Sequence, residues 1–290
     1  MRLAIGIATR GRAVILGEVL DELRRQTRAP DRVLVCHVTE EDIAGLPARF
    51  PQVQFMASPA GLPRQRNAIL DAVGDCDAVL FLDDDFLPMP DYLAVTERVL
   101  MAHPDCVVTT GTVIADGAKG PGLSVAEGRA LLAADVPPED ALAVTPHFNG
   151  YGCNMAFRLA PLRTHGIRVD ESLPLYGWYE DIDVTRALGR HGSILRLAGA
   201  RGVHLGAKSG RVSGLRLGYS QVANPVYLAR KGTFPWSHAI PSAARHTAMN
   251  ALRSLAPEPH VDRFGRFRGN LIALTDLLRG RAHPARILEL

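Results

Sequence analysis

The sequence predicts an α/β fold built on a mainly parallel sheet flanked by helices. Apolar, strand-like runs alternate with stretches of helical spacing along the first half of the chain. Of its 290 residues 47% are hydrophobic and 22% charged, which allows one large domain or a domain with an appendage. In addition, one apolar run ends in three aspartates, which indicates a polar site at the end of a strand.

The elements of the first half follow from the period of the apolar residues. From β-branched and apolar runs we predict strands at residues 3–8, 32–37, 53–57, 78–82 and 107–113. From apolar residues three and four apart we predict helices at residues 13–26, 62–73 and 91–102.

The second half is less regular. Residues 115–146 are rich in Gly and Pro and predict an insertion with a short helix at 125–134. After it we expect strands at 149–158, 193–197 and 200–205 and a helix at 179–190. From residue 215 onward the pattern is mostly helical, with breaks expected near Pro225, Pro235, Pro241 and Pro257.

Cysteine usage and charge narrow the class of protein. The four cysteines are scattered without a Cys-x-x-Cys pair, so we expect buried free thiols and a cytoplasmic location. No apolar stretch is long enough to span a bilayer. Residues 1–200 hold 19 basic and 26 acidic residues, whereas residues 201–290 hold 14 and 4. The basic third therefore suits an anionic partner, which could be a phosphorylated ligand, a membrane, nucleic acid or the chain's own acidic half.

The strongest single feature is the run Asp83-Asp84-Asp85 after the apolar residues 78–82. Because side chains alternate along a strand, Asp83 and Asp85 should point to the same side and Asp84 to the other. Two converging carboxylates suit a divalent cation such as Mg²⁺, which completes its shell with substrate phosphates. The alternative is a solvated acidic turn stopped by Pro88 and Pro90.

A second acidic cluster lies at residues 178–183, Trp-Tyr-Glu-Asp-Ile-Asp, at the start of a predicted helix. Acidic residues in a first turn interact favourably with the helix dipole, and this structural alternative fits Asp183 better than it fits Trp178. Trp178 beside carboxylates also suits a sugar, because the ring packs on the pyranose and a carboxylate accepts from a hydroxyl. A carboxylate bonded to that hydroxyl can act as its general base.

Two basic segments are candidates for binding phosphates. The loop after His204 carries Lys208 and Arg211 among glycines and a serine, a composition that suits a diphosphate, and His204 could complete the shell of a metal there. Arg64 and Arg66 oppose the dipole preference at a helix start, which indicates an anionic partner. A satisfied polar histidine and solvated arginines are the structural alternatives.

In this order the motifs resemble those of the family 2 glycosyltransferases, inverting enzymes of the GT-A fold. The residues that carry the resemblance are 8–12 (Ala-Thr-Arg-Gly-Arg), Arg66-Asn67, Asp83-Asp84-Asp85, 152–158, Glu180-Asp181 and His204. Residues 177–183 also look like the acceptor segment of galactosyltransferase-type enzymes. The likeness covers roughly residues 3–211 and implies a transfer from a nucleotide sugar, UDP-linked by default, to a saccharide or glycolipid acceptor.

The resemblance implies a role for each matching residue. Asp85, Asp83 and His204 would hold Mn²⁺ or Mg²⁺. Asp181 would be the base and Glu180 would order the acceptor. Acceptor contacts would also come from Trp178, Tyr179 and Asn154. The nucleotide-sugar donor would be bound by Thr9, Arg10, Glu40, Arg64, Arg66, Asn67, Asp83, Asp84, Lys208 and Arg211.

Two departures bear on the choice of nucleotide. His37 stands where the family usually has an Asp that reads the base, so Glu40 or Asp42 would have to substitute. Arg10 stands where the family often has Tyr. We expect a catalytic domain at 1–211, divided into a nucleotide-sugar half (1–113) and an acceptor half (114–211), and a basic helical region at 212–290.

Other function classes fit less well. A sugar-nucleotide nucleotidyltransferase should have a glycine-rich loop with Lys after the first strand, and an aspartyl phosphatase should carry its Asp-x-Asp on that strand. Nucleic-acid binding is not expected, because aromatic residues make up only 6% of the chain and no recognition motif occurs. The C-terminal helices either pack on the core or form a basic amphipathic surface. Such a surface would make peripheral contact with the anionic inner face of the cell membrane.

Overall fold

The computed structural model describes residues 1–209, 213–256 and 258–290. The chain forms two compact units. The first comprises Met1–Ala60, Arg64–Arg168 and Ala187–Gly210, and the second Gly61–Pro63, Val169–Arg186 and Arg211–Leu290. The domain boundary expected at residues 211 and 212 lies outside the described residues.

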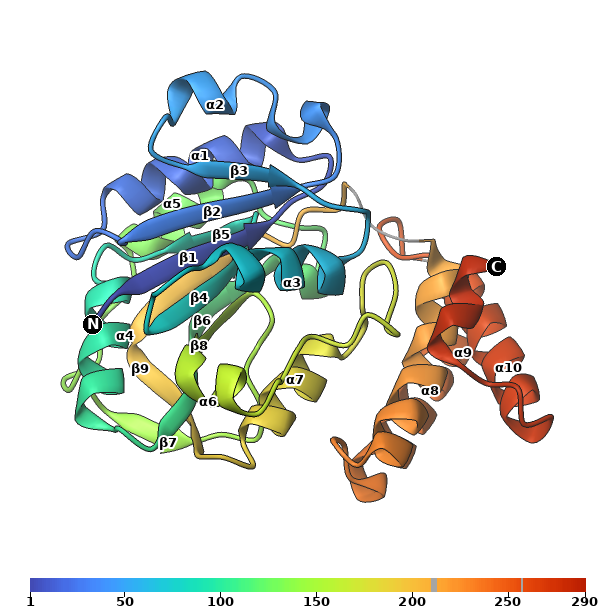
Figure 1. Cartoon of the computed structure of the whole chain (residues 1–290). Coiled ribbons are helices and arrows are strands. Elements are labelled where there is room, and N and C mark those ends of the chain that lie inside the picture. Colours follow the sequence, from blue (N-terminus) through green and yellow to red (C-terminus); the bar gives the residue numbers. More distant parts are fainter. Residues whose placement is uncertain (210–212, 257) are drawn as a thin grey trace. The chain divides into compact units, whose positions relative to one another are not determined.

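A nine-stranded mixed sheet forms the core of the first unit (Figure 1). Its strands run in the order β3-β2-β1-β4-β8-β6-β9-β5, with β7 paired to β9. Their bounds are β1 Leu3–Ala8, β2 Arg32–His37, β3 Gln54–Ala57, β4 Ala78–Asp83, β5 Phe86–Pro88, β6 Cys106–Asp116, β7 Val144–Pro146, β8 Asn154–Arg158 and β9 Ser193–His204. The predicted α/β class, with helices flanking a mainly parallel sheet, is confirmed.

Helices and short 3₁₀ turns connect these strands. They are α1 Ala13–Arg24, η1 Glu40–Ile43, α2 Leu46–Arg49, α3 Leu62–Ala72, α4 Tyr92–Ala102, η2 Gly117–Lys119, α5 Val125–Ala133, α6 Leu159–Thr164 and α7 Glu180–Leu188. The apolar sides of α1 and α4 are buried against the sheet, in one cluster with the inward side chains of β1 and β4. Each predicted helix of the first half exists, because its apolar spacing matches the face that it buries.

The register of the parallel strands brings their carboxyl ends to one edge. Ala8 at the end of β1 lies opposite Cys36 of β2 and Asp83 of β4. Because the three strands run parallel, the segments that follow them start from neighbouring points. This edge therefore collects Thr9, the loop after β2 and the three aspartates.

The chain turns after Asp83 and returns as the short strand β5. Phe86 of β5 lies opposite His204 of β9, and the amide of Leu205 donates to the carbonyl oxygen of Asp85 at 2.9 Å. Gly206 follows with φ +66°, and a Cβ there would lie 2.1 Å from the backbone nitrogen of Ala118. Glycine is required at this turn, which keeps the loop after β9 close to the aspartates.

One predicted break in the sheet is wrong. Residues 193–197 and 200–205 were expected as two strands, but they form the single strand β9. The register against β6 shifts between the pairs Thr110–Arg196 and Thr112–Arg201, so an irregular stretch around Ala198 and Gly199 is accommodated without ending the strand.

The second unit contains the helices α8 Gly214–Lys231, α9 Trp236–Arg253 and α10 Arg263–Leu278, followed by η3 Pro284–Leu288. Tyr219, Val222 and Ala223 of α8 pack with Ala273 of α10 and Ile287. A buried amide chain adds specificity: Asn250 donates to Gln221 and to Asn270, and Asn270 donates to the carbonyl of Gly218. None of the described helices has the length and apolarity needed to cross a membrane.

The breaks predicted at Pro225 and Pro241 are wrong, because α8 and α9 continue through both prolines. A proline removes one backbone hydrogen bond and bends a helix, but packing can outweigh that cost. Around Pro225 the side chains of Val222, Ala223 and Leu228 are all buried. Tertiary contacts therefore hold α8 together where the local sequence favours a break. Pro257 lies outside the described residues.

Close packing of α8 on α10 depends on Gly218. A Cβ at this position would lie 2.0 Å from the backbone oxygen of Arg266. We expect Gly218→Ala to lower the free energy of unfolding by about 1–3 kcal/mol, because the helices must separate. Gly120→Ala is the matched control, since no atom of the described residues lies within 4 Å of its Cβ position. Urea denaturation measures both, and equal effects of the two substitutions would contradict the packing argument.

Candidate active site

The three aspartates after β4 divide between two sides, as the alternation of side chains predicts. The carboxylates of Asp83 and Asp85 face the His204 ring, at 3.7 Å and 3.3 Å from its Nε2 atom. Asp84 faces away and accepts hydrogen bonds from Thr9 Oγ1 at 2.8 Å and Arg12 Nη1 at 2.7 Å. The run therefore directs its carboxylates to two sides, each with a cationic partner, and is not a solvated turn.

Asp83, Asp85 and His204 form a candidate metal centre. One ligand atom from each residue lies within 4.8 Å of the others. Asp85 Oδ1 is buried and faces His204 Nε2 at 3.3 Å, and the side chain of Asp83 is 31% exposed. A buried carboxylate oxygen beside a second carboxylate and an imidazole fits a divalent cation that solvent and substrate reach from the Asp83 side.

His204 is oriented by a residue that the sequence analysis missed. Its Nδ1 atom lies 2.9 Å from Asp116 Oδ1, at the end of β6. The same carboxylate accepts from the Tyr151 hydroxyl at 3.0 Å and from the Ala118 amide at 3.1 Å. A carboxylate behind a histidine fixes its ring and leaves the other nitrogen for a metal. The signal for Asp116 was the parallel register of β6 and β9, which places it directly opposite His204.

The charges around His204 explain its protonation. Burial alone lowers the pKa of His204, but contacts with Asp116 and Asp85 and the charge of Asp83 outweigh it and raise the pKa to about 10. Burial likewise works against ionisation of Asp116, yet His204 and the Ala118 amide bring its pKa down to about 2. Without a metal, the imidazolium therefore supplies the positive charge at this centre.

Arg12 is a second residue that the sequence analysis did not assign to the site. Its guanidinium donates to Asp84, lies 3.4 Å from Asp85 and donates to the carbonyls of Ala207 and Ser209. Burial and the repulsion of Asp85 raise the pKa of Asp84 to about 6 despite the opposing effect of Arg12. Arg12 thus joins the loop after β1 to the loop after β9.

The loop after β9 lies against the acidic centre. The amide of Ala207 donates to Asp85 Oδ2 at 2.7 Å, and the Lys208 ammonium donates to the carbonyl of Gly117 at 3.1 Å. Lys208 therefore lies beside η2, near the Asp116 end of the site. Arg211, the other cation expected to hold phosphate, lies outside the described residues.

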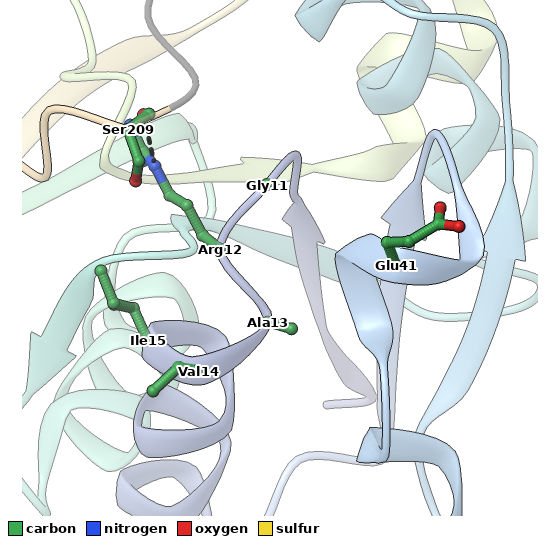
Figure 2. Close-up of a pocket in the computed structure, with 7 residues that line it drawn as sticks. All are labelled: Gly11, Arg12, Ala13, Val14, Ile15, Glu41 and Ser209. Carbon is green, nitrogen blue, oxygen red and sulfur yellow. Dashed lines mark hydrogen bonds between the residues drawn. The ribbon is translucent and has the colours of Figure 1, made fainter.

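A hollow of about 430 Å³ opens at the start of α1 (Figure 2). Its lining consists of Gly11, Arg12, Ala13, Val14, Ile15, Glu41 and Ser209. Figure 2 shows the Arg12 side chain reaching the Ser209 backbone, with Glu41 carried on η1. Of the donor-binding residues expected from the resemblance, Arg10 is exposed in the loop after β1 and Glu40 is exposed at the start of η1.

Asp42, considered as a base reader, has a structural role in the same region. It is buried and accepts hydrogen bonds from the backbone amides of Gly11, Val38 and Thr39. These donors lower its pKa even though burial opposes the shift. Asp42 therefore ties the loop after β1 to the loop after β2.

The remaining predicted residues of the first unit are mostly buried. Arg66 lies over the Phe81 ring, donates to the Gly152 carbonyl at 2.7 Å and lies 3.5 Å from Asp83. Asn154 has no exposed surface and accepts from the Thr110 hydroxyl. Asn67 is also buried, whereas Arg64 is exposed. Donor and acceptor contacts by these residues stay predictions.

The predicted acceptor segment belongs to the second unit, where the backbone is strained. Leu175 and Tyr179 have φ of +60° and +74°, and Gly177 between them has +63°. Positive φ is unfavourable for an aromatic residue and is often found at functional sites. The Trp178 ring stacks on Tyr179 at 5.1 Å and meets His246 edge-on at 5.6 Å. The strained turn thus presents an aromatic group directly before α7.

The carboxylates at the start of α7 have different surroundings. Glu180 is buried, and Asp181 is half-buried and accepts from the amide of Ile182 at 2.8 Å. Asp183 is fully buried and accepts from Lys231 at 2.6 Å and from Thr233 at 2.5 Å. Asp183 is therefore structural, while the partly exposed Asp181 is the better candidate for a base.

The fold is similar to those of solved glycosyltransferases. S. aureus TarS 1-349 has a TM-score of 0.59 and 15% identity, covering 99% of this chain and 82% of its own. A mannosyltransferase from Pyrobaculum calidifontis, in complex with GDP-Man and Mn²⁺, has a TM-score of 0.55 and 17% identity. The match covers 99% of this chain and 85% of the mannosyltransferase. GalNAc-T7 with UDP, GalNAc and Mn²⁺ has a TM-score of 0.61 and 12% identity. The match covers 97% of this chain and 57% of GalNAc-T7.

These similarities establish the fold. No protein-family model matches the sequence, and no curated protein matches it either. At sequence identities of 12–17%, these structures establish the fold and nothing further. The predicted GT-A fold is therefore confirmed: this chain has the fold of the nucleotide-sugar glycosyltransferases.

We expect Mn²⁺ binding to displace a proton from His204. Because its pKa is raised to about 10, the ring is protonated at neutral pH and must become neutral to act as a ligand. The apparent affinity should rise up to about tenfold per pH unit between pH 6 and 8. Calorimetry in buffers of different ionisation enthalpy counts the protons released. His204→Gln should abolish the pH dependence and His260→Gln, at an exposed position, should preserve it; binding without proton release would contradict the assignment.

Proposed function

We propose that this chain is a metal-dependent, inverting glycosyltransferase of family 2. It transfers a sugar from a nucleotide-diphosphate donor, UDP-linked by default, to a saccharide or glycolipid acceptor. In this proposal the enzyme works in the cytoplasm, and the reaction belongs to polysaccharide or glycan biosynthesis. The observation that carries the proposal is the Asp83–Asp85–His204 cluster at the carboxyl edge of the sheet in a GT-A fold.

Complexes of proteins with this fold support the donor class. Solved structures include S. aureus TarS 1-349 with UDP-GlcNAc and with UDP, and the mannosyltransferase with GDP-Man and Mn²⁺. Two different bases occur among them, which leaves the base to experiment. In this chain Asp42 is engaged by three backbone amides, so Glu40 is the candidate base reader of the two.

The chemistry that we propose is a single displacement. The Asp181 carboxylate takes the proton of the acceptor hydroxyl, whose oxygen attacks the anomeric carbon. The bond from that carbon to the diphosphate oxygen breaks with its electron pair on the leaving group, and attack from the opposite side inverts the configuration. A bound Mn²⁺ or Mg²⁺ would neutralise the charge that develops on the diphosphate.

The described residues support this division of roles. Asp83 and His204 would hold the cation together with Asp85, while Asp116 keeps the His204 ring in place. Arg12 and Lys208 supply fixed positive charge around the loop after β9. We assign the acceptor to the aromatic turn at Trp178 and Tyr179, with Glu180 ordering it.

Removing the ligand at the end of the acidic run should remove metal-linked donor binding. We expect UDP or GDP with Mn²⁺ to raise the melting temperature of the wild type, and the effect to vanish in Asp85→Asn. Asp91→Asn, at an exposed position, is the matched control and should respond like the wild type. A thermal-shift panel of nucleoside diphosphates with and without Mn²⁺ also reports the preferred base. A nucleotide response equal in Asp85→Asn and wild type would disprove the metal assignment.

Neutralising the proposed base should separate binding from transfer. We expect Asp181→Asn to keep the nucleotide response and to lower kcat by about 10²–10⁴-fold, since an amide cannot accept the proton. Product formation with a panel of nucleotide sugars measures the effect, with Asp91→Asn again as the control. Near-wild-type turnover of Asp181→Asn would mean that another group is the base.

A further inference from the structure

Helix α10 carries an apolar stripe on an exposed face. Phe264, Phe267, Leu271, Leu274 and Leu278 follow one another at intervals of three, four, three and four residues. This spacing places all five on one side of a helix. Phe264 is 62% exposed and Leu278 is 91% exposed. Of the other three, Phe267 is half-buried, and Leu271 and Leu274 are exposed. We call these five residues the α10 stripe.

The neighbouring helix α9 has an exposed apolar row as well. Ile240, Ala244, Ala248 and Leu252 recur every fourth residue, and Ile240 and Leu252 are 61% and 70% exposed. Leu255, just beyond the helix, is 85% exposed. So many exposed large apolar side chains on one small helical unit indicate an interaction surface.

The charges on this unit are strongly unequal. In residues 213–290 there are 11 basic and 4 acidic residues. All four acidic side chains are engaged within the unit: Glu258 with Arg253 and Arg263, Asp262 at the start of α10, Asp276 with Arg286, and Glu289 with Arg286. The described part of residues 213–290 therefore presents almost only cationic charge to its surroundings.

Two exposed arginines lie along the edge of the stripe. Arg268 lies four residues after Phe264 and three before Leu271, and Arg279 follows Leu278. On a helix, residues three and four apart are neighbours, so the Arg268 guanidinium borders the apolar side chains. An apolar stripe bordered by arginines is the pattern of a helix that lies in a membrane interface.

We propose that the exposed face of α10 docks on an anionic lipid surface. The α10 stripe enters the boundary between headgroups and acyl chains, while Arg268 and Arg279 contact lipid phosphates. A second copy of the chain fits this face less well. Two such units would bring an excess of positive charge together, and the stripe spans only two heptads, fewer than a stable coiled coil needs. The proposal is independent of the sugar chemistry.

Vesicle flotation of the full chain tests this docking. We expect the wild type to float with vesicles of equal parts phosphatidylglycerol and phosphatidylcholine, and to be released by salt. Pure phosphatidylcholine vesicles should bind it far more weakly. The double variants Leu271→Glu/Leu278→Glu and Arg268→Glu/Arg279→Glu should each lose about tenfold or more in partitioning. Met101→Glu, at a 66% exposed helix position of the first unit, is the matched control and should float like the wild type.

Several results would overturn the proposal. One is a wild type that stays in solution with the anionic vesicles at low salt, and another is undiminished flotation of both double variants. Circular dichroism and melting temperatures establish that these variants are folded, since all four positions are exposed. Sedimentation of the protein without vesicles tests whether a second copy binds the stripe instead. A dimer that Leu271→Glu/Leu278→Glu dissociates would assign the stripe to a second copy.

Discussion

The mutual repulsion of three consecutive carboxylates is the constraint on which the first unit depends. Asp84 and Asp85 are buried, so each needs a positive charge beside it. Arg12 supplies that charge on one side and His204 on the other. Removing one partner of a buried ion pair costs about 3–5 kcal/mol, a large part of the stability of an ordinary domain. The loops after β1 and β9 are therefore held at the acidic centre by electrostatics as well as by strand pairing.

Much of this arrangement could be predicted because it follows from local patterns. The apolar runs of β1, β2 and β4 identify buried strands, and parallel pairing aligns their carboxyl ends. Alternation then separates Asp84 from Asp83 and Asp85, and the site at this edge follows. Asp83, Asp85 and His204 come together as expected even though His204 is 119 residues beyond Asp85, because β5 returns directly onto β9.

What the sequence analysis missed depends on contacts between distant segments. Arg12 looks like one more exposed arginine until the loop after β9 supplies two carbonyls for it. Asp116 falls within the insertion predicted at residues 115–146, and only the register of β6 against β9 places it behind His204. The continuation of α8 through Pro225 has the same origin, since buried neighbours outweigh a local preference. In each case the deciding energy comes from tertiary packing or from a charge far away in the sequence.

The uneven distribution of charge in this chain separates two kinds of partner. In the first unit the carboxylates of Asp83 and Asp85 converge on His204, so the site attracts a cation. In residues 213–290 the opposite holds, because all four acidic side chains are engaged internally while Arg268 and Arg279 remain exposed beside apolar side chains. Cations bound by carboxylates favour phosphates as further ligands, whereas arginines bordering an apolar stripe favour the interface of an anionic lipid bilayer. A nucleotide-sugar reaction on a lipid-linked acceptor would use both properties in one chain, because the donor needs the first and proximity to the acceptor benefits from the second.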